Sequence, residues 1–135
     1  MPPRDLTKRL VEAGTIWGPT VGYSRAVQVG RTIHVAGTTG LDADGKPAAG
    51  GMYGQSKQAL ANIVAALRQL GAGPEHVVRT RIFVTDISQW EEVGRAHGEI
   101  FAEIRPASTM LEITRLIDPA LMVEIEADAL LPEDR

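Results

Sequence analysis

The chain has 135 residues, a formal net charge of −3 and no cysteine. This length is typical of one domain that buries roughly two-thirds of its unfolded surface, and the lack of cysteine excludes disulfides, thiolate metal sites and a cysteine nucleophile. The negative charge disfavours nucleic acid as a partner. No apolar run approaches the roughly 20 residues that span a bilayer, and residues 1–14 lack the apolar core of a signal peptide. We therefore expect a soluble, cytoplasmic protein without a membrane partner.

The first regular elements that the sequence predicts form a β-hairpin. Residues 25–30 and 31–40 each alternate between polar and apolar side chains, and Gly30 stands at the turn between them. In the second strand, strict alternation puts Ile33 and Val35 on one face. The opposite face is then expected to hold Thr32, His34, Ala36 and Thr38.

A long helix and a third strand follow a loop that is rich in Gly, Asp and Pro. Residues 54–74 repeat Leu, Ile and Val at helical spacing, and Gly71 is a suitable stop. Residues 75–86 predict a strand with two different faces. One face is expected to hold Val78, Ile82 and Val84, and the other Arg79, Arg81 and Phe83.

A second helix and two more strands complete the chain. Residues 86–104 predict a helix with Ser88 and Glu91 as its capping box, Trp90 in its apolar stripe and Pro106 beyond its end. Residues 107–116 and 121–130 predict strands. The order is therefore β-β-α-β-α-β-β, an α/β chain whose mixed sheet has two helices on one face. The other face must meet solvent or another subunit.

The last strand carries three acidic side chains on one face, Glu124, Glu126 and Asp128. A solvated sheet face explains them, and so does a pocket in which one of them is a general acid or base. Periodicity does not choose between these alternatives.

Other polar residues give weaker indications of function. The three histidines show no metal-ligand spacing; His34 could line a cleft, whereas His97 suits a helix surface. Arg79 and Arg81 could hold an anion or form an ion-paired face. Nothing near Ser24 would activate it as a nucleophile.

Four segments together resemble the Rid family of reactive intermediate deaminases, formerly called the YjgF family. They are "GYSRAVQVGRTIHVAGTTGLD", "QALANIVAALRQLGAGPEHVVRTRIFVTD", "FAEIRPASTMLEITRL" and "VEIEADAL". The resemblance implies a single Rid-like domain over residues 1–135, with its core at about residues 22–131. It also implies a chorismate-mutase-like fold, a homotrimer whose three sheets form a central barrel, and ligand clefts between subunits. The implied activity is hydrolysis of enamine and imine intermediates, such as 2-aminoacrylate, to a 2-keto acid and ammonia, with no metal or organic cofactor.

The resemblance assigns roles residue by residue. Glu124 matches the glutamate that positions the hydrolytic water, Tyr23 a tyrosine near the pocket mouth, and Gly37 the glycine of the strand that lines the pocket. Thr38 and Thr39 are expected to hydrogen-bond the ligand.

Two departures from the family pattern affect the substrate. Deaminase members carry an arginine where this chain has Ser108 and a cysteine where it has Met110; both positions are still expected to contact the ligand. The arginine holds the substrate carboxylate by charge-assisted hydrogen bonds, each contributing about 1.5–3 kcal/mol. Its loss predicts roughly tenfold to hundredfold weaker binding of a 2-imino acid.

Three functions therefore compete. The favoured one is cofactor-free hydrolysis, by Glu124, of a small imine, enamine or related electrophile, in particular one without a carboxylate. The second is a trimer that binds or senses a metabolite in the same clefts without turnover. The third, RNA cleavage or a chaperone-like activity, is disfavoured by the net charge and by the lack of a basic stripe.

Overall fold

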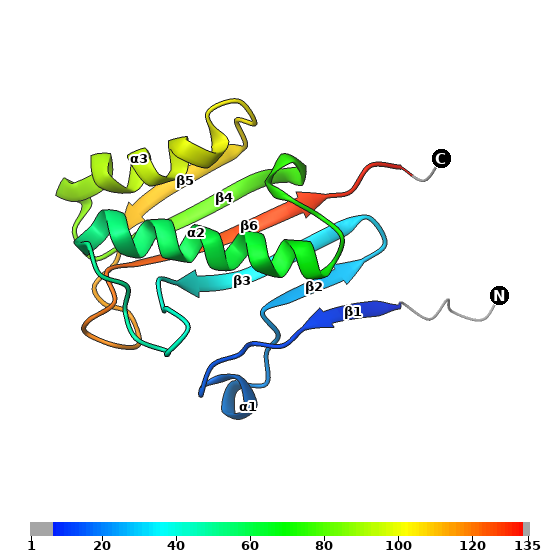
Figure 1. The fold of residues 1–135 in the computed structure, drawn as a ribbon, viewed down its shortest axis with the longest axis horizontal. Helices are drawn as coiled ribbons and strands as arrows, with labels where there is room; N and C mark the ends of the chain where they lie inside the picture. The colour runs from blue at the N-terminus through cyan, green and yellow to red at the C-terminus, as the bar shows by residue number, and fades with distance from the viewer. Residues whose placement is uncertain (1–6, 134–135) are drawn as a thin grey trace.

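The computed structural model describes residues 7–133, whose strands form one six-stranded sheet in the order β1-β2-β3-β6-β4-β5 (Figure 1). β4 and β5 are parallel, and the other neighbouring strands are antiparallel, so the sheet is mixed as expected. The strands are β1 (Lys8–Val11), β2 (Ala26–Val29), β3 (Thr32–Thr39), β4 (Val77–Val84), β5 (Ala107–Glu112) and β6 (Val123–Leu130).

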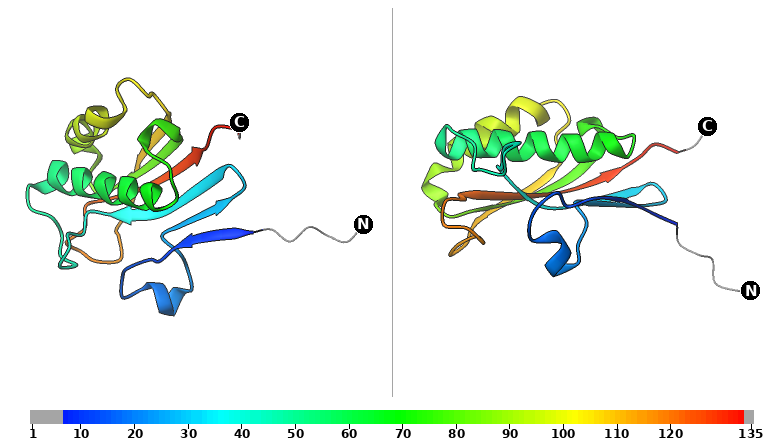
Figure 2. Two further views of the ribbon diagram at one scale, coloured as in Figure 1. Left: turned by 45° about the vertical axis from the view of Figure 1, so that its right-hand side comes forward. Right: turned by 60° about the horizontal axis from the view of Figure 1, so that its bottom comes forward.

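The two long helices, α2 (Gly51–Gln69) and α3 (Trp90–Phe101), cover one face of the sheet (Figures 1 and 2). Their buried side chains and those of the central strands form the hydrophobic core, with Leu60, Ile63 and Leu67 of α2 fully enclosed. The opposite face, which we call the open face, carries only the short helix α1 (Gly18–Val21) at one end (Figure 2). The expected one-sided cover of helices is therefore confirmed.

β1 and α1 are elements that the sequence did not predict. β1 pairs with β2 and extends the sheet by one strand at its edge. Only Val11 of this edge strand is buried. Its sequence, Lys-Arg-Leu-Val, therefore needs no alternation of polar and apolar residues and gave no strand signal. Residues 1–6 lie outside the described part of the chain.

A β-bulge in β3 overturns the expected alternation of that strand. Val35 pairs with Ala127, but the next pairing joins Thr38 to Ile125, so two residues, Ala36 and Gly37, stand opposite one. The extra residue reverses the faces beyond the bulge. Thr38 is therefore 3 % exposed on the core side, where strict alternation had placed it with His34 on the other face.

A register shift near the start of β4 has the same effect there. The shift lies between Val77 and Arg79. Val78 is consequently 50 % exposed, and Thr80, not Val78, joins Ile82 in the core at 1 % exposed. The expectation for Val78 was wrong.

The start of the second helix also differs from the prediction. Asp86, rather than Ser88, caps the segment, accepting hydrogen bonds from the backbone N–H and the hydroxyl of Ser88. Residues Ile87–Gln89 form a 3-10 turn (η2) before α3, and Pro74–His76 form another (η1) before β4. Trp90 is 55 % exposed, so it is not part of the apolar stripe.

Candidate functional site

The carboxylate of Glu124 lies against the bulge of β3, on the open face. Gly37 has no side chain, and a Cβ built on it would stand 2.8 Å from Cδ and 3.0 Å from Oε2 of Glu124. Glycine is therefore required here for close approach rather than for a positive φ. The bulge and the glycine together make the recess that the acid occupies.

The surroundings of Glu124 favour its protonated form. Burial raises its pKa, the neighbouring carboxylate of Glu126 raises it further, and the positive charge of Arg25 acts in the opposite direction. A carboxyl group whose pKa is raised in a cleft is a candidate general acid or base.

Arg25 holds the walls around Glu124 together. Its Nη1 donates to the carbonyl of Gly37 at 2.8 Å and to the hydroxyl of Thr38 at 2.9 Å. Its Nη2 donates to the hydroxyl of Tyr23 at 3.2 Å and to the carbonyl of Ala13 at 3.4 Å. The guanidinium thus joins the bulge of β3 to the segments on either side of α1.

These side chains surround a cavity of about 310 Å³, which we call the Glu124 cleft. Trp17, Val21 and Ile117 form its apolar walls. Val21 and Ile117 are exposed, at 66 % and 62 %. The polar side chains that line the cleft are those of Thr15, Tyr23, Arg25, Thr39, Glu124 and Glu126.

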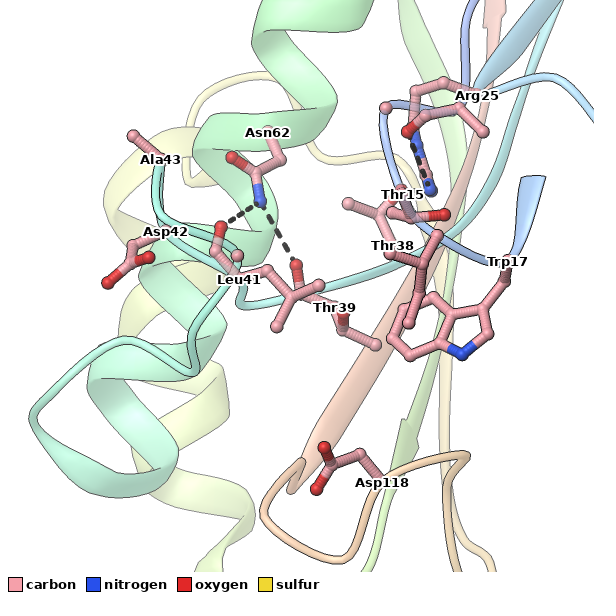
Figure 3. A pocket seen from close by; sticks show the side chains of 14 residues that line it. Thr15, Trp17, Arg25, Thr38, Thr39, Leu41, Asp42, Ala43, Asn62 and Asp118 are labelled. Atoms are coloured by element: carbon pink, nitrogen blue, oxygen red, sulfur yellow. Dashed lines mark hydrogen bonds between the residues drawn. The ribbon is translucent and has the colours of Figure 1, made fainter. Parts of the chain in front are cut away.

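A second cavity of about 480 Å³ adjoins the Glu124 cleft and shares Thr15, Trp17, Arg25 and Thr39 with it. Figure 3 shows the ring of Trp17 on one side and the carboxylate of Asp118 below. The amide of Asn62, on α2, donates to the carbonyls of Thr39 and Leu41 and so fixes the loop that leaves β3. The two cavities meet at the end of β3.

Most of the remaining charges on the open face are paired with one another. Arg81 contacts Asp128 at 3.1 Å and Glu126 at 3.7 Å, and His34 Nδ1 lies 2.8 Å from Asp128. Asp128 and Arg81 therefore form an ion-paired surface, which is the simpler of the alternatives that the sequence left open. Glu124 is the acid of this strand that lies against the bulge, and Glu126 also lines the cleft.

Within one chain, Ser108 and Met110 are not brought together with Glu124. They pair with Thr80 and Ile82, whose side chains are buried beneath the helices, whereas Glu124 lies on the open face. The two positions therefore lie on the opposite side of the sheet from the cleft, and only another subunit could bring them to it.

Ser108 belongs to a short chain of hydrogen bonds under α3. The hydroxyl of Thr80 donates to Oγ of Ser108 at 2.8 Å and lies 2.9 Å from Nε2 of His97. Because Thr80 has one hydroxyl proton, Nε2 of His97 must donate to it. Burial lowers the pKa of His97, which keeps the ring neutral. The expectation that His97 lies on the helix surface is wrong.

The other predicted ligand contacts divide between the two cavities. Tyr23, Gly37 and Thr39 line the Glu124 cleft, whereas Thr38 lines the second cavity. The hydroxyl of Thr38 donates to the carbonyl of Ala36 and accepts from Arg25, so its single proton is already used within the chain. Among residues 7–133, no three His, Asp or Glu side chains are grouped as metal ligands, and no helix is long and apolar enough to cross a bilayer.

Arg25, Trp17 and Asn62 are site residues that the sequence did not reveal. Arg25 precedes a strand in a polar stretch, and its acceptors are 12 and 13 residues away in the chain. An arginine at the start of a strand indicates a site residue only when that strand is known to border a cavity, and the sequence does not show the cavity.

Comparisons with known proteins show which family the chain resembles. The sequence model of the family described as endoribonuclease L-PSP matches residues 15–131. An uncharacterized protein of Streptomyces coelicolor is 37 % identical over 121 residues, which are 90 % of each chain. The human 2-iminobutanoate/2-iminopropanoate deaminase is 31 % identical over 127 residues, 93 % of this chain and 92 % of the human one.

The fold is also that of a solved relative. The crystal structure of a member of the YjgF/YER057c/UK114 family from Mycobacterium tuberculosis superposes with a TM-score of 0.84 at 48 % identity, covering 93 % of this chain and all of that one. The chain therefore belongs to the Rid family, formerly YjgF, whose sequence model is described as endoribonuclease L-PSP.

Proposed function

We propose that this protein hydrolyses a small reactive imine or enamine, or a related electrophile, without a cofactor. The observation that carries the proposal is the position of Glu124, half-buried against Gly37 with its pKa raised. The human relative, whose name is 2-iminobutanoate/2-iminopropanoate deaminase, supports the reaction class.

The proposed reaction needs one base and one water molecule. Glu124 accepts a proton from water as the oxygen attacks the carbon of the C=N bond, and it delivers that proton to the nitrogen to give a neutral carbinolamine. Glu124 then takes the proton of the new hydroxyl group as the C=O bond forms and the C–N bond breaks, and it passes that proton to the departing nitrogen, so that a ketone and ammonia leave and the carboxylate is restored. An enamine first takes up a proton at carbon to become the imine. The protein contributes orientation and a carboxyl group whose pKa is raised by its surroundings.

The charges near Glu124 favour a substrate without a carboxylate. Each Nη of Arg25 donates two hydrogen bonds, and all four bonds go to acceptors of the protein itself. Arg25 therefore has no pair of donors to offer a carboxylate. Ser108, at the position of the family arginine, supplies only a neutral hydroxyl.

We further propose that the protein acts as a homotrimer with its clefts between subunits. Exposed apolar side chains on the open face support this arrangement: Leu10 is 60 %, Leu111 43 % and Leu130 43 % exposed. Burial of such a face against other copies is favourable. The same arrangement would let Ser108 and Met110 of one subunit approach the Glu124 cleft of the next.

The test is hydrolysis of imines that an amine or amino-acid oxidase generates in the assay. Wild type is compared with Glu124→Gln and with Glu91→Gln, which removes an exposed carboxylate of α3. We expect the wild type and Glu91→Gln to accelerate hydrolysis of carboxylate-free imines and Glu124→Gln to lose the acceleration. Full activity in Glu124→Gln would refute the role of Glu124.

Ser108→Arg tests the substrate preference. We expect this variant to gain activity toward 2-imino acids, by roughly tenfold to hundredfold, because a charged hydrogen-bond donor returns to that position. No gain in a variant that remains trimeric would show that position 108 does not face the cleft.

A metabolite-binding trimer without turnover is the second candidate. It is favoured by the second cavity, of about 480 Å³, which Glu124 does not line. It predicts saturable binding of a small molecule with no product, which calorimetry and product analysis on the same samples would separate from hydrolysis.

A further inference from the structure

Arg25 forms hydrogen bonds with three separate segments of the chain. Its acceptors are the carbonyl of Ala13, the hydroxyl of Tyr23, and the carbonyl of Gly37 with the hydroxyl of Thr38. These groups lie before α1, between α1 and β2, and in the bulge of β3. No other side chain in residues 7–133 donates hydrogen bonds to all three segments.

Each of these segments forms part of the wall around Glu124. The bulge provides the surface on which the carboxylate lies, and Tyr23 lines the cleft. The hydroxyl of Tyr23 is held from its other side by the hydroxyl of Thr15, at 3.1 Å. Loss of the guanidinium would therefore leave the position of the bulge, and with it that of the carboxylate, less well defined.

The charge of Arg25 acts on Glu124 as well. Three titratable groups line the cleft with Glu124: Glu126 on its own strand, and Tyr23 and Arg25 just before β2. Arg81 on β4 contacts Glu126 and so lies one residue further away. Arg81 contacts Asp128 as well as Glu126. Arg25, by contrast, forms no salt bridge with a carboxylate among the described residues. Arg25 is therefore the cation that offsets the burial of Glu124 and its repulsion by Glu126.

We propose that Arg25 is a positioning residue of the Glu124 cleft. It holds the Gly37 bulge and Tyr23 in place around the carboxylate, and its fixed charge keeps Glu124 available as a base, while its own hydrogens do not reach the substrate. This role deepens the proposed hydrolysis, but its first test does not depend on turnover.

The first test is the titration of the Glu124 carboxyl carbon by NMR. It is measured in wild type, Arg25→Gln and Arg25→Lys, with Arg31→Gln as the control, since Arg31 is exposed and contacts Glu133 at 3.6 Å. We expect the midpoint to move to higher pH in Arg25→Gln, to stay close to wild type in Arg25→Lys, and to be unchanged in Arg31→Gln. An unchanged midpoint and an unchanged Gly37 amide resonance in Arg25→Gln would overturn the proposal.

Kinetics on a carboxylate-free imine provide the second test. Arg25→Lys keeps the charge but concentrates its donors on one nitrogen, so it cannot reach all four acceptors. We expect its kcat to fall roughly tenfold to hundredfold with KM little changed, because the carboxylate is displaced by a fraction of an ångström. A wild-type kcat in Arg25→Lys would refute the positioning role, including in the case that Arg25→Gln does not fold.

The two tests separate this proposal from the proposed function. If wild type hydrolyses no imine, the enzymatic hypothesis fails, whereas the response of the Glu124 titration to Arg25→Gln still decides whether Arg25 acts on that carboxylate.

Discussion

Gly37→Ala is the substitution that most directly tests how Glu124 is held. The new Cβ would lie 2.8 Å from Cδ of Glu124, and the carboxylate must withdraw by about 0.6 Å to restore a normal contact. The atoms that must move are the end of a flexible side chain rather than backbone, so we expect a loss of only about 1 kcal/mol of unfolding free energy. Catalysis is more sensitive to position, and we expect kcat to fall roughly tenfold to hundredfold.

The assay combines urea unfolding with imine hydrolysis, and Gly98→Ala is the matched control. Gly98 lies in α3, and a Cβ there would meet nothing within 4 Å. We expect Gly98→Ala to keep full activity and to gain up to about 1 kcal/mol, because alanine is the better helix former. Wild-type kcat in Gly37→Ala would refute the argument that the bulge positions the base, and unfolding of that variant would show that the contact is not relieved by the side chain.

Three further predictions concern burial. Folding raises the pKa of Glu124, so the stability linked to this group is present below its ordinary pKa of 4.5 and is lost as the pH rises through the raised pKa. We therefore expect Glu124→Gln to be at least as stable as wild type at pH 7 and to lack this component of the pH dependence. Urea unfolding from pH 4 to 8 measures both. Thr80→Val leaves Nε2–H of His97 without its acceptor and should lower the unfolding free energy by about 1–3 kcal/mol; an unchanged urea midpoint would contradict the hydrogen-bond chain. Gly40→Ala places a Cβ 2.3 Å from the backbone oxygen of Gln55, where no side chain can give way, and should cost about 3 kcal/mol or more; a thermal midpoint within two degrees of wild type would refute that contact.

Local patterns in the sequence were sufficient for most of the fold. The alternation in β6 correctly predicted that its three acids share one face, and Val123, Ile125, Ala127 and Ala129 are buried on the other. The repeated apolar residues of α2, with Gly71 in a left-handed conformation after its end, predicted that helix. Such patterns succeed because the period of a helix or strand and the burial of one face are both local consequences of chain geometry.

The predictions failed where a single extra residue changed the phase of a strand. Strict alternation placed Thr38 with His34, and only the pairing of β3 with β6 shows the bulge that separates them. The same limit applies to Val78 in β4. A bulge depends on the register of the partner strand, which a period within one segment does not contain.

The sequence by itself determined the family, the mixed sheet with its two helices on one face, and Glu124 as the candidate base. Only the tertiary structure decided what surrounds that base: the recess over Gly37, the arginine that joins three segments, and the separation of Ser108 from the cleft by the thickness of the sheet. The reason is physical. Periodicity places a residue on a face, whereas a site depends on contacts between residues far apart in the chain, such as Arg25 with Gly37 and Gly37 with Glu124.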